Sequence, residues 1–335
     1  LQKQEEIYDW FVDSHLKVGK KAHNVAAFLP WHRAFTVKYE RALQKIDPKV
    51  VLPYWDWSID AQAPELSVIL SEKYMGSNGE PNTHCVKDGL AKDWEIRIPE
   101  RRCLKRDYRY GNRTGPFWDK SLIEAMITKN TNYHEFRQDL EYNPHAIVHD
   151  NLSHIWGDMN KMVTPNDPLF FMHHVMVDKI WWEWQQRDPK RLTEYSGYGA
   201  TINDSLWRMD VNVGQVMDTT SDGSCFTYER YSSPNVLEAL KQSPLLKRDK
   251  INYKDDNIWE AIDSIPFNSI PEKYKATLGT EHAKNNKLVI PDRISSELIR
   301  VNNLNPDGVQ KKYEQLAKIS ALLNANTDFE PDTSL

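Results

Sequence analysis

Apolar residues recur at helical spacing in two N-terminal stretches, and each stretch carries a histidine on its apolar stripe. In residues 4–17 this spacing places His15 on the inward face of a predicted helix. Pro30 interrupts the pattern, and residues 31–43 then predict a second helix with His32 on its stripe. The pattern therefore directs both imidazoles toward the interior of the protein.

Later stretches predict more helices, separated by a long irregular region. Residues 60–118 show few periodic signals, whereas residues 119–140 look helical. Residues 169–186 show a strong amphipathic pattern, and the pair Asp167-Pro168 marks the start of this helix. The chain is therefore predicted to be mainly α, with long irregular loops.

The character of the chain changes after about residue 232. Residues 233–335 contain one tryptophan, one histidine and two glycines, and they alternate short helical patterns with proline-bearing turns. A length of 335 residues allows a sizeable core and at most two units. We therefore divide the chain into a domain over residues 1–232 and a mostly helical C-terminal extension over residues 233–335, with a modest core of its own.

Composition and charge exclude some classes of partner. The apolar share of 40% and the charged share of 27% are ordinary for a globular protein. A net charge of −5 gives no electrostatic reason to expect binding to nucleic acid or to an anionic membrane. No apolar run approaches the roughly 20 residues that a membrane-spanning helix needs.

Glycosylation sequons favour secretion. They occur at Asn112, Asn151 and Asn203. Residues 1–6 contain no apolar stretch, so a signal peptide is not expected within this chain.

Two of the three cysteines flank one irregular, charged loop. These are Cys85 and Cys103, and we predict that they form a disulfide bond. Cys225 is then left without a partner in this chain.

Histidines gather in two groups that lie far apart in the sequence. The first group is His15, His23 and His32, and the second is His145, His149 and the doublet His173-His174. Imidazole is the usual ligand for zinc, copper, iron and nickel, and three nitrogens per metal leave positions open for O2 or a substrate oxygen. Two such groups predict a binuclear centre, and a pair of redox metals can take up O2.

Other kinds of metal site fit this pattern poorly. Neither group contains cysteine, which argues against blue-copper sites and cysteine-rich structural zinc sites. The metalloprotease motif His-Glu-x-x-His is absent, and no pattern of two histidines and a carboxylate dominates either group. The remaining histidines stand alone and are interpreted as structural or surface residues: His84, His134, His154 and His282.

Three motifs in this part of the chain resemble the tyrosinase family of type-3 copper proteins, which includes catechol oxidases and hemocyanin functional units. The motifs are Phe28-Leu29-Pro30-Trp31-His32-Arg33 with Glu40, Pro53-Tyr54-Trp55-Asp56-Trp57, and Asn166-Asp167-Pro168-Leu169-Phe170-Phe171-Met172-His173-His174 with Asp178. The resemblance covers roughly residues 5–232 and is closest to fungal secreted members. It implies a catalytic domain built on a four-helix bundle that holds two copper ions.

The resemblance also implies a role for each histidine. His15, His23 and His32 would bind the first copper, and His145, His149 and His174 would bind the second. The family's ligand in the doublet is the second histidine, so His173 is expected to lie just outside the ligand set.

Arg33 and Asp178 each follow a ligand by a fixed step. We predict that they pair beneath the site and orient the two helices that carry the ligands. The alternative is a surface salt bridge of little energetic value.

The activity implied by the resemblance is oxidation of o-diphenols to o-quinones with O2, with o-aminophenols as further candidate substrates. Hydroxylation of monophenols would also need a group that deprotonates the phenol. Glu141, four residues before His145, matches the family's water-orienting glutamate, and a solvated loop carboxylate is the alternative of similar weight. Ala146 cannot orient a water, and Asp150 is the candidate substitute as a proton acceptor.

Two other functions use the same histidines. An O2 carrier of the hemocyanin type would usually repeat the unit along a much longer chain, so an enzyme is favoured. A non-oxidising relative that binds zinc is less favoured, because histidine fills all six ligand positions.

The extension has two candidate roles. Residues 225–231 resemble the tyrosine-containing motif that closes the family's catalytic core, and tails beyond that motif often cover the active site. A packing segment or an oligomer contact is the alternative.

Overall fold

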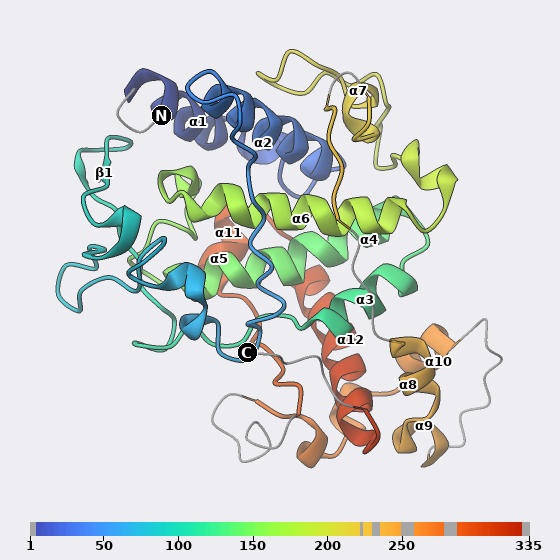
Figure 1. Ribbon diagram of the computed structural model, residues 1–335. Helices are drawn as coiled ribbons and strands as arrows, with labels where there is room; N and C mark the ends of the chain where they lie inside the picture. The colour runs from blue at the N-terminus through green and yellow to red at the C-terminus, as the bar shows by residue number, and fades with distance from the viewer. Residues whose placement is uncertain (1–4, 222–223, 230–234, 249–257, 278–286, 330–335) are drawn as a thin grey trace.

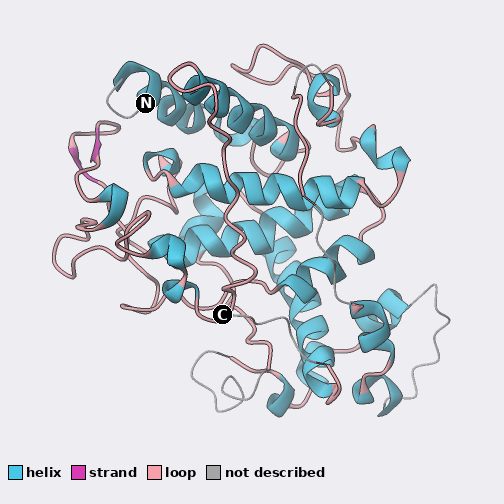
Figure 2. Ribbon diagram, viewed as in Figure 1, coloured by secondary structure: helices cyan, strands magenta, loops and turns pink. Residues whose placement is uncertain are grey.

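The computed structural model describes residues 5–221, 224–229, 235–248, 258–277 and 287–329. The chain is mainly helical over these ranges, as the sequence predicts (Figure 2). Strand structure within them is confined to β1 (Glu95–Ile96) and β2 (Arg102–Cys103), which pair antiparallel in the irregular region. None of the described helices is both long and apolar enough to cross a bilayer.

The first two helices are α1 (Glu5–Val18) and α2 (Phe28–Gln44). The prediction that Pro30 interrupts the helical pattern is wrong, because α2 begins two residues before it. Proline is tolerated there, since the first four N–H groups of a helix have no partner within the helix. The first N–H after the proline, that of Trp31, already donates to the carbonyl oxygen of Ala27 at 2.9 Å.

The helix α6 (Leu169–Gln185) runs through the middle of the molecule (Figure 1). The sequence predicts a helix with one apolar face, but every residue of α6 except Glu183 is buried. A helix that is apolar nearly all round is enclosed by other elements on every side. Asp167 caps its start by accepting a hydrogen bond from the backbone N–H of Leu169 at 3.0 Å.

Residues 119–140 form two helices rather than one, α3 (Lys120–Lys129) and α4 (Tyr133–Leu140). The division occurs where Asn132 caps α4, accepting a hydrogen bond from the backbone N–H of Glu135. A π-helical turn (Glu141–His145) then joins α4 directly to α5 (Ala146–Ser153). Such turns are rare and occur often at functional sites.

We interpret α1, α2, α5 and α6 as the four core helices that the sequence predicts. Helix α2 packs against α6, and the π-helical turn contacts α6 as well. Figure 1 shows α1 and α2 side by side along one flank of α6, with α5 along another.

The extension packs onto this core. Its helices are α8 (Val236–Lys241), α9 (Pro244–Arg248), α10 (Ile258–Ser264), α11 (Ser296–Val301) and α12 (Pro306–Ala325). Helix α12 contacts α3 and the π-helical turn, and its buried apolar residues belong to the same continuous core as those of α1, α2 and α6. The expectation of a separate small core is therefore wrong, since the apolar faces of α12 and the domain cover each other.

Short helical turns complete the described chain. One four-residue helix, α7 (Gly214–Met217), lies beside α2. Single 3-10 turns span Gly19–Lys21, Pro64–Leu66, Val68–Leu70, Gly89–Ala91, Thr164–Asn166, Pro189–Leu192, Phe267–Ser269 and Glu272–Tyr274.

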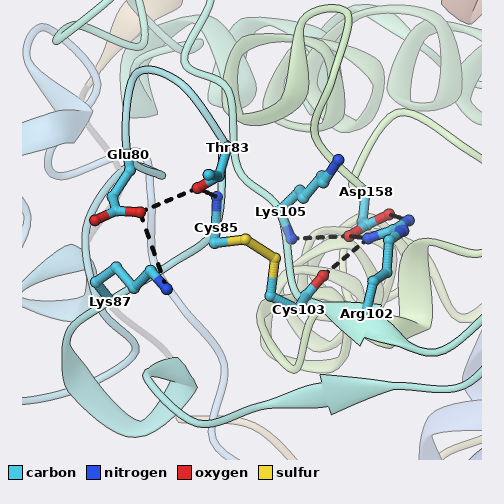
Figure 3. The surroundings of a disulfide bond; sticks show 8 residues. All are labelled: Glu80, Thr83, Cys85, Lys87, Arg102, Cys103, Lys105 and Asp158. Atoms are coloured by element: carbon cyan, nitrogen blue, oxygen red, sulfur yellow. Dashed lines mark hydrogen bonds and ion pairs between the residues drawn. A yellow bond between two sulfur atoms is a disulfide. The ribbon is translucent and has the colours of Figure 1, made fainter.

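The predicted disulfide between Cys85 and Cys103 is present (Figure 3). It closes a loop across 18 positions and lies beside Asp158, which binds Arg102. Cys225 is exposed and is not disulfide-bonded, as the sequence predicts.

We expect the double replacement Cys85→Ser and Cys103→Ser to lower the free energy of unfolding by about 3 kcal/mol, because an open loop of this length gains chain entropy when unfolded. Urea unfolding followed by circular dichroism measures the change. Cys225→Ser is the matched control and should leave the midpoint unchanged; an equal midpoint for all three proteins would contradict a stabilising role.

Candidate metal centre

The first histidine group comes from the N-terminal helix pair. His15 lies in the last turn of α1, His23 follows the turn Gly19–Lys21, and His32 lies in the second turn of α2. All three side chains are buried, and one nitrogen of each lies within 4.8 Å of one nitrogen of the others. One metal ion can therefore be reached by all three.

The second group is carried by the π-helical turn and two helices. His145 ends the turn, His149 lies one helical turn later in α5, and the doublet lies in α6. His145, His149, His173 and His174 are buried, and one ring nitrogen of each lies within 4.8 Å of one of the others. The face shared by His145 and His149 is the one that their spacing predicts.

Backbone carbonyl groups set the tautomer of five imidazoles. The Nδ1-to-oxygen distances are 2.9 Å for His15 and Met162, 3.0 Å for His23 and Gly19, 2.7 Å for His32 and Phe28, 3.0 Å for His145 and Glu141, and 2.6 Å for His149 and Met159. A carbonyl oxygen can only accept a hydrogen bond, so each Nδ1 carries the proton. Each Nε2 is then left with the lone pair that a metal needs.

Burial keeps these imidazoles neutral. It is the largest cause that lowers the pKa of every histidine in the two groups, to about 4 for His23 and His149. Within the described chain, the buried Nε2 atoms of His15, His32 and His145 have no hydrogen-bond partner. Buried polar atoms are rarely left unpaired, and a bound cation would satisfy them.

The two groups face each other and form one site. The rings of His32 and His174 stack with their centroids 4.3 Å apart, although they come from different groups. Phe28 and Phe170 pack against imidazoles of both groups, which excludes water around the site. The donor set is therefore two clusters of neutral nitrogen ligands in one apolar shell, a set suited to copper.

The doublet is divided between two positions. Nε2 of His174 lies 3.4 Å from Nε2 of His149, and its ring also touches the first group. The ring of His173 instead stacks on His145 and packs near Trp57. This placement supports the expectation that His174 is the ligand and that His173 backs the ligand set.

Arg33 and Asp178 pair beneath the site, as predicted. Arg33 Nε donates to Asp178 Oδ1 at 2.6 Å, and neither side chain is more than 4% exposed, so the surface-pair alternative is wrong. Tyr228 donates its hydroxyl hydrogen to the other oxygen at 2.7 Å. Burial raises the pKa of Asp178, whereas Arg33 and Tyr228 oppose that rise. The pair joins the helices that carry His32 and His174.

Glu141 is buried rather than solvated, which removes the alternative reading of its carboxylate. One oxygen accepts from the backbone N–H of Asn24 and the other from Arg137, both at 2.6 Å. Burial raises its pKa, and Arg137 opposes that rise. Glu141 therefore links the residue after His23 to the turn that carries His145. The ion pair between Arg137 and Glu141 could have been predicted from the sequence, because residues four positions apart on a helix are neighbours.

Asp150 points to the extension. Its oxygens bind Arg109 at 2.9 Å, and the backbone N–H and hydroxyl of Ser295 at 2.7 and 2.6 Å. Ser295 also caps α11. The expected role of Asp150 as a proton acceptor stays a prediction, while these contacts describe an anchor.

A small cavity lies over the histidines. It is lined by four of the imidazoles, by Met159, Asn160, Lys161 and Thr164, and by the extension residue Asn302. The cavity has a volume of about 10 Å³, close to the space that one water molecule needs. Lys161 and Asn302 were not identified from the sequence, because no local pattern distinguishes them from other surface residues.

Comparisons with known proteins identify relatives of this chain. The family described as the common central domain of tyrosinase matches residues 5–187. A tyrosinase of Aspergillus flavus is 32% identical over 256 residues, which cover 68% of this chain and 70% of that protein. A tyrosinase of Streptomyces antibioticus is 35% identical over 218 residues, 58% of this chain and 78% of that protein.

The fold is shared with a solved polyphenol oxidase. The structure of a variant from Thermothelomyces thermophila matches with a TM-score of 0.57 and 23% identity. The match covers 67% of this chain and 78% of that chain.

We expect Asp178→Asn to weaken metal binding about 10- to 100-fold, as removal of ligand-supporting groups does elsewhere. It also leaves Arg33 buried without its charge partner, which costs about 3–5 kcal/mol of stability. Tyr228→Phe, which removes one hydrogen bond to the same carboxylate, is the milder control. Competition with a copper chelator measures affinity, and unchanged affinity in a destabilised Asp178→Asn protein would contradict the support role.

Proposed function

This chain belongs to the tyrosinase family and is a type-3 copper oxidoreductase; we propose that it binds two copper ions and oxidises o-diphenols to o-quinones with O2. Each diphenol gives up two electrons and two protons, and two turnovers reduce one O2 to two molecules of water. The observation that carries this proposal is the pair of buried imidazole clusters, in which the Nε2 atoms of His15, His32 and His145 have no hydrogen-bond partner among the described residues.

We propose His15, His23 and His32 as ligands of one copper, and His145, His149 and His174 as ligands of the other. The carbonyl hydrogen bonds to Nδ1 support five of these assignments, because they leave Nε2 free. A bound copper pair would supply O2 binding and electron transfer, while the protein holds the imidazoles in place and keeps water out.

Oxidation of diphenols is the main activity that we propose, and hydroxylation of monophenols is the weaker one. Both oxygens of Glu141 already accept hydrogen bonds, from Asn24 and from Arg137, which weakens the case for Glu141 as a water-orienting residue. Ala146 offers no polar group beside His145. A diphenol needs less help with deprotonation, so these contacts favour it as the substrate.

We expect copper-loaded protein to bind two copper ions per chain and to consume O2 with 4-methylcatechol at least tenfold faster than with 4-methylphenol, the matching monophenol. A rate gap of that size corresponds to about 1.4 kcal/mol in the barrier. The matching o-aminophenol tests the further candidate substrate. An oxygen electrode measures the consumption of O2, and absorbance measures the quinone formed. Reversible O2 binding without quinone would indicate a carrier instead.

We propose that the extension covers the active site. Asn302 lies in the cavity wall, and the neighbouring carbonyl of Asn303 accepts a hydrogen bond from the side chain of Asn24 at 2.8 Å. The anchor between Asp150 and Ser295 holds the start of α11 against the helix that carries His149. The cavity is too small for a diphenol, and we propose that Asn302 is the lining residue that moves to admit one.

We expect Asn302→Gly to raise kcat/KM for 4-methylcatechol about fivefold or more, a gain of roughly 1 kcal/mol, because it removes the side chain from the cavity wall. Copper content should stay the same. Arg300→Ala, at an exposed position of α11 two residues before Asn302, is the control. No gain in activity for Asn302→Gly would favour the packing role of the extension.

Secretion is also proposed, and the structure restricts which sequons could carry a glycan. Asn112 and Asn203 are exposed. Asn151 is 1% exposed, and its side-chain nitrogen donates to the carbonyl oxygen of Pro116 at 3.0 Å. A glycan at Asn151 would require the folded core to open, so we propose Asn112 and Asn203 as the acceptors.

A further inference from the structure

We propose that Lys161 recognises a negatively charged group on the substrate, so that the favoured diphenols carry a carboxylate. This inference rests on the proposed function, because it names the class of diphenol that enters the same site.

The backbone holds Lys161 beside both histidine groups. The carbonyl oxygen of Met159 accepts the hydrogen bond from Nδ1 of His149, and that of Met162 accepts the one from Nδ1 of His15. Lys161 lies between these two carbonyl groups in the sequence and lines the cavity. The backbone of Lys161 is therefore held near both histidine groups by the same contacts that orient two of their imidazoles.

Among the residues that line this cavity, Lys161 is the only one whose side chain carries a formal charge at neutral pH. The other described lining residues are neutral histidines, Met159, Thr164 and two asparagines, Asn160 and Asn302. No carboxylate lines the cavity. A substrate that enters it therefore meets one positive charge and no protein group that would repel an anion.

The ammonium group of Lys161 has no carboxylate partner among the described residues. Its Nζ donates one hydrogen bond, to the carbonyl oxygen of Trp156 at 3.3 Å. Burial is the largest cause that lowers its pKa. A partly desolvated cation interacts more strongly with an anion than a cation in open water does.

The acidic groups near Lys161 are already bound elsewhere. Asp158 binds the guanidinium of Arg102 at 2.6 and 2.9 Å and accepts the backbone N–H of Lys105 at 2.9 Å, as Figure 3 shows. Asp107 accepts the backbone N–H groups of residues 155 and 156. These carboxylates are therefore committed to the loop that they hold.

The extension does not supply a partner either. The carboxylate of Glu297 in α11 pairs with Arg300 at 2.5 Å, and this hydrogen bond is the largest cause that lowers the pKa of Glu297, with a smaller effect from Lys161. Glu297 therefore does not neutralise Lys161. If Asn302 moves to open the cavity, as proposed above, Lys161 stays available to the incoming substrate. A diphenol with an ammonium group should be repelled by the same charge.

The test compares three diphenols that differ in charge: 4-methylcatechol, which is neutral, dihydrocaffeate, which is anionic, and dopamine, which is cationic. The quantity measured is the ratio of kcat/KM for each charged diphenol to that for 4-methylcatechol. We expect Lys161→Gln to lower the dihydrocaffeate ratio about tenfold, the size of one lost charge-assisted hydrogen bond. Lys161→Glu should lower it further and raise the dopamine ratio.

Lys105→Gln is the matched control, since it removes a nearby positive charge that does not line the cavity. An unchanged dihydrocaffeate ratio in Lys161→Gln, or an equal fall in Lys105→Gln, would overturn the inference.

Failure of the proposed function has a separate signature. If the wild-type protein oxidises none of the three diphenols, calorimetric titration with benzoate decides the role of Lys161. Asn302→Gly protein should then bind benzoate about tenfold more tightly than the protein that also carries Lys161→Gln. Benzamide, which is uncharged, should bind both equally. Equal binding of benzoate would overturn the inference.

Discussion

The site depends on hydrogen bonds from imidazole Nδ1 to backbone carbonyl groups. Three of them reach back four residues along the chain, from His23, His32 and His145. The other two, from His15 and His149, both end on residues 159–162. One short segment therefore fixes an imidazole in each histidine group, and it couples the two halves of the centre to each other.

Burial makes those hydrogen bonds decisive. An apolar shell lowers the pKa of the imidazoles, so they are neutral donors with a free Nε2 at physiological pH. The same burial makes the Arg33–Asp178 pair indispensable, because either charge alone would be very costly in this position. Water is excluded from the helix core. This one constraint explains both why the imidazoles are neutral and why the charges of Arg33 and Asp178 must be paired.

The extension is part of the catalytic unit in physical terms. Helix α12 shares the core of the domain, and Ser295 is bound to the carboxylate of Asp150, the residue after His149. Removal of the extension would expose apolar surface and leave Asp150 buried beside Arg109 with fewer partners. The proposed route to the site therefore depends on local movement near Asn302, and the proposed substrate choice on the residues that line the cavity, Lys161 among them.

The sequence by itself determined the chemistry: histidine positions, helical spacing and family motifs identified the donor set, and two cysteines around one loop identified the disulfide. These features are local or are marked by rare residue types. It misjudged α6 as half exposed, because periodicity does not reveal how many neighbours enclose a helix. Only the tertiary structure shows the contacts from Glu141 to Asn24 and from Asp150 to Ser295, which span more than a hundred residues, and the places of Lys161 and Asn302 in the cavity wall. Such contacts depend on how helices pack, which single positions in a sequence do not encode.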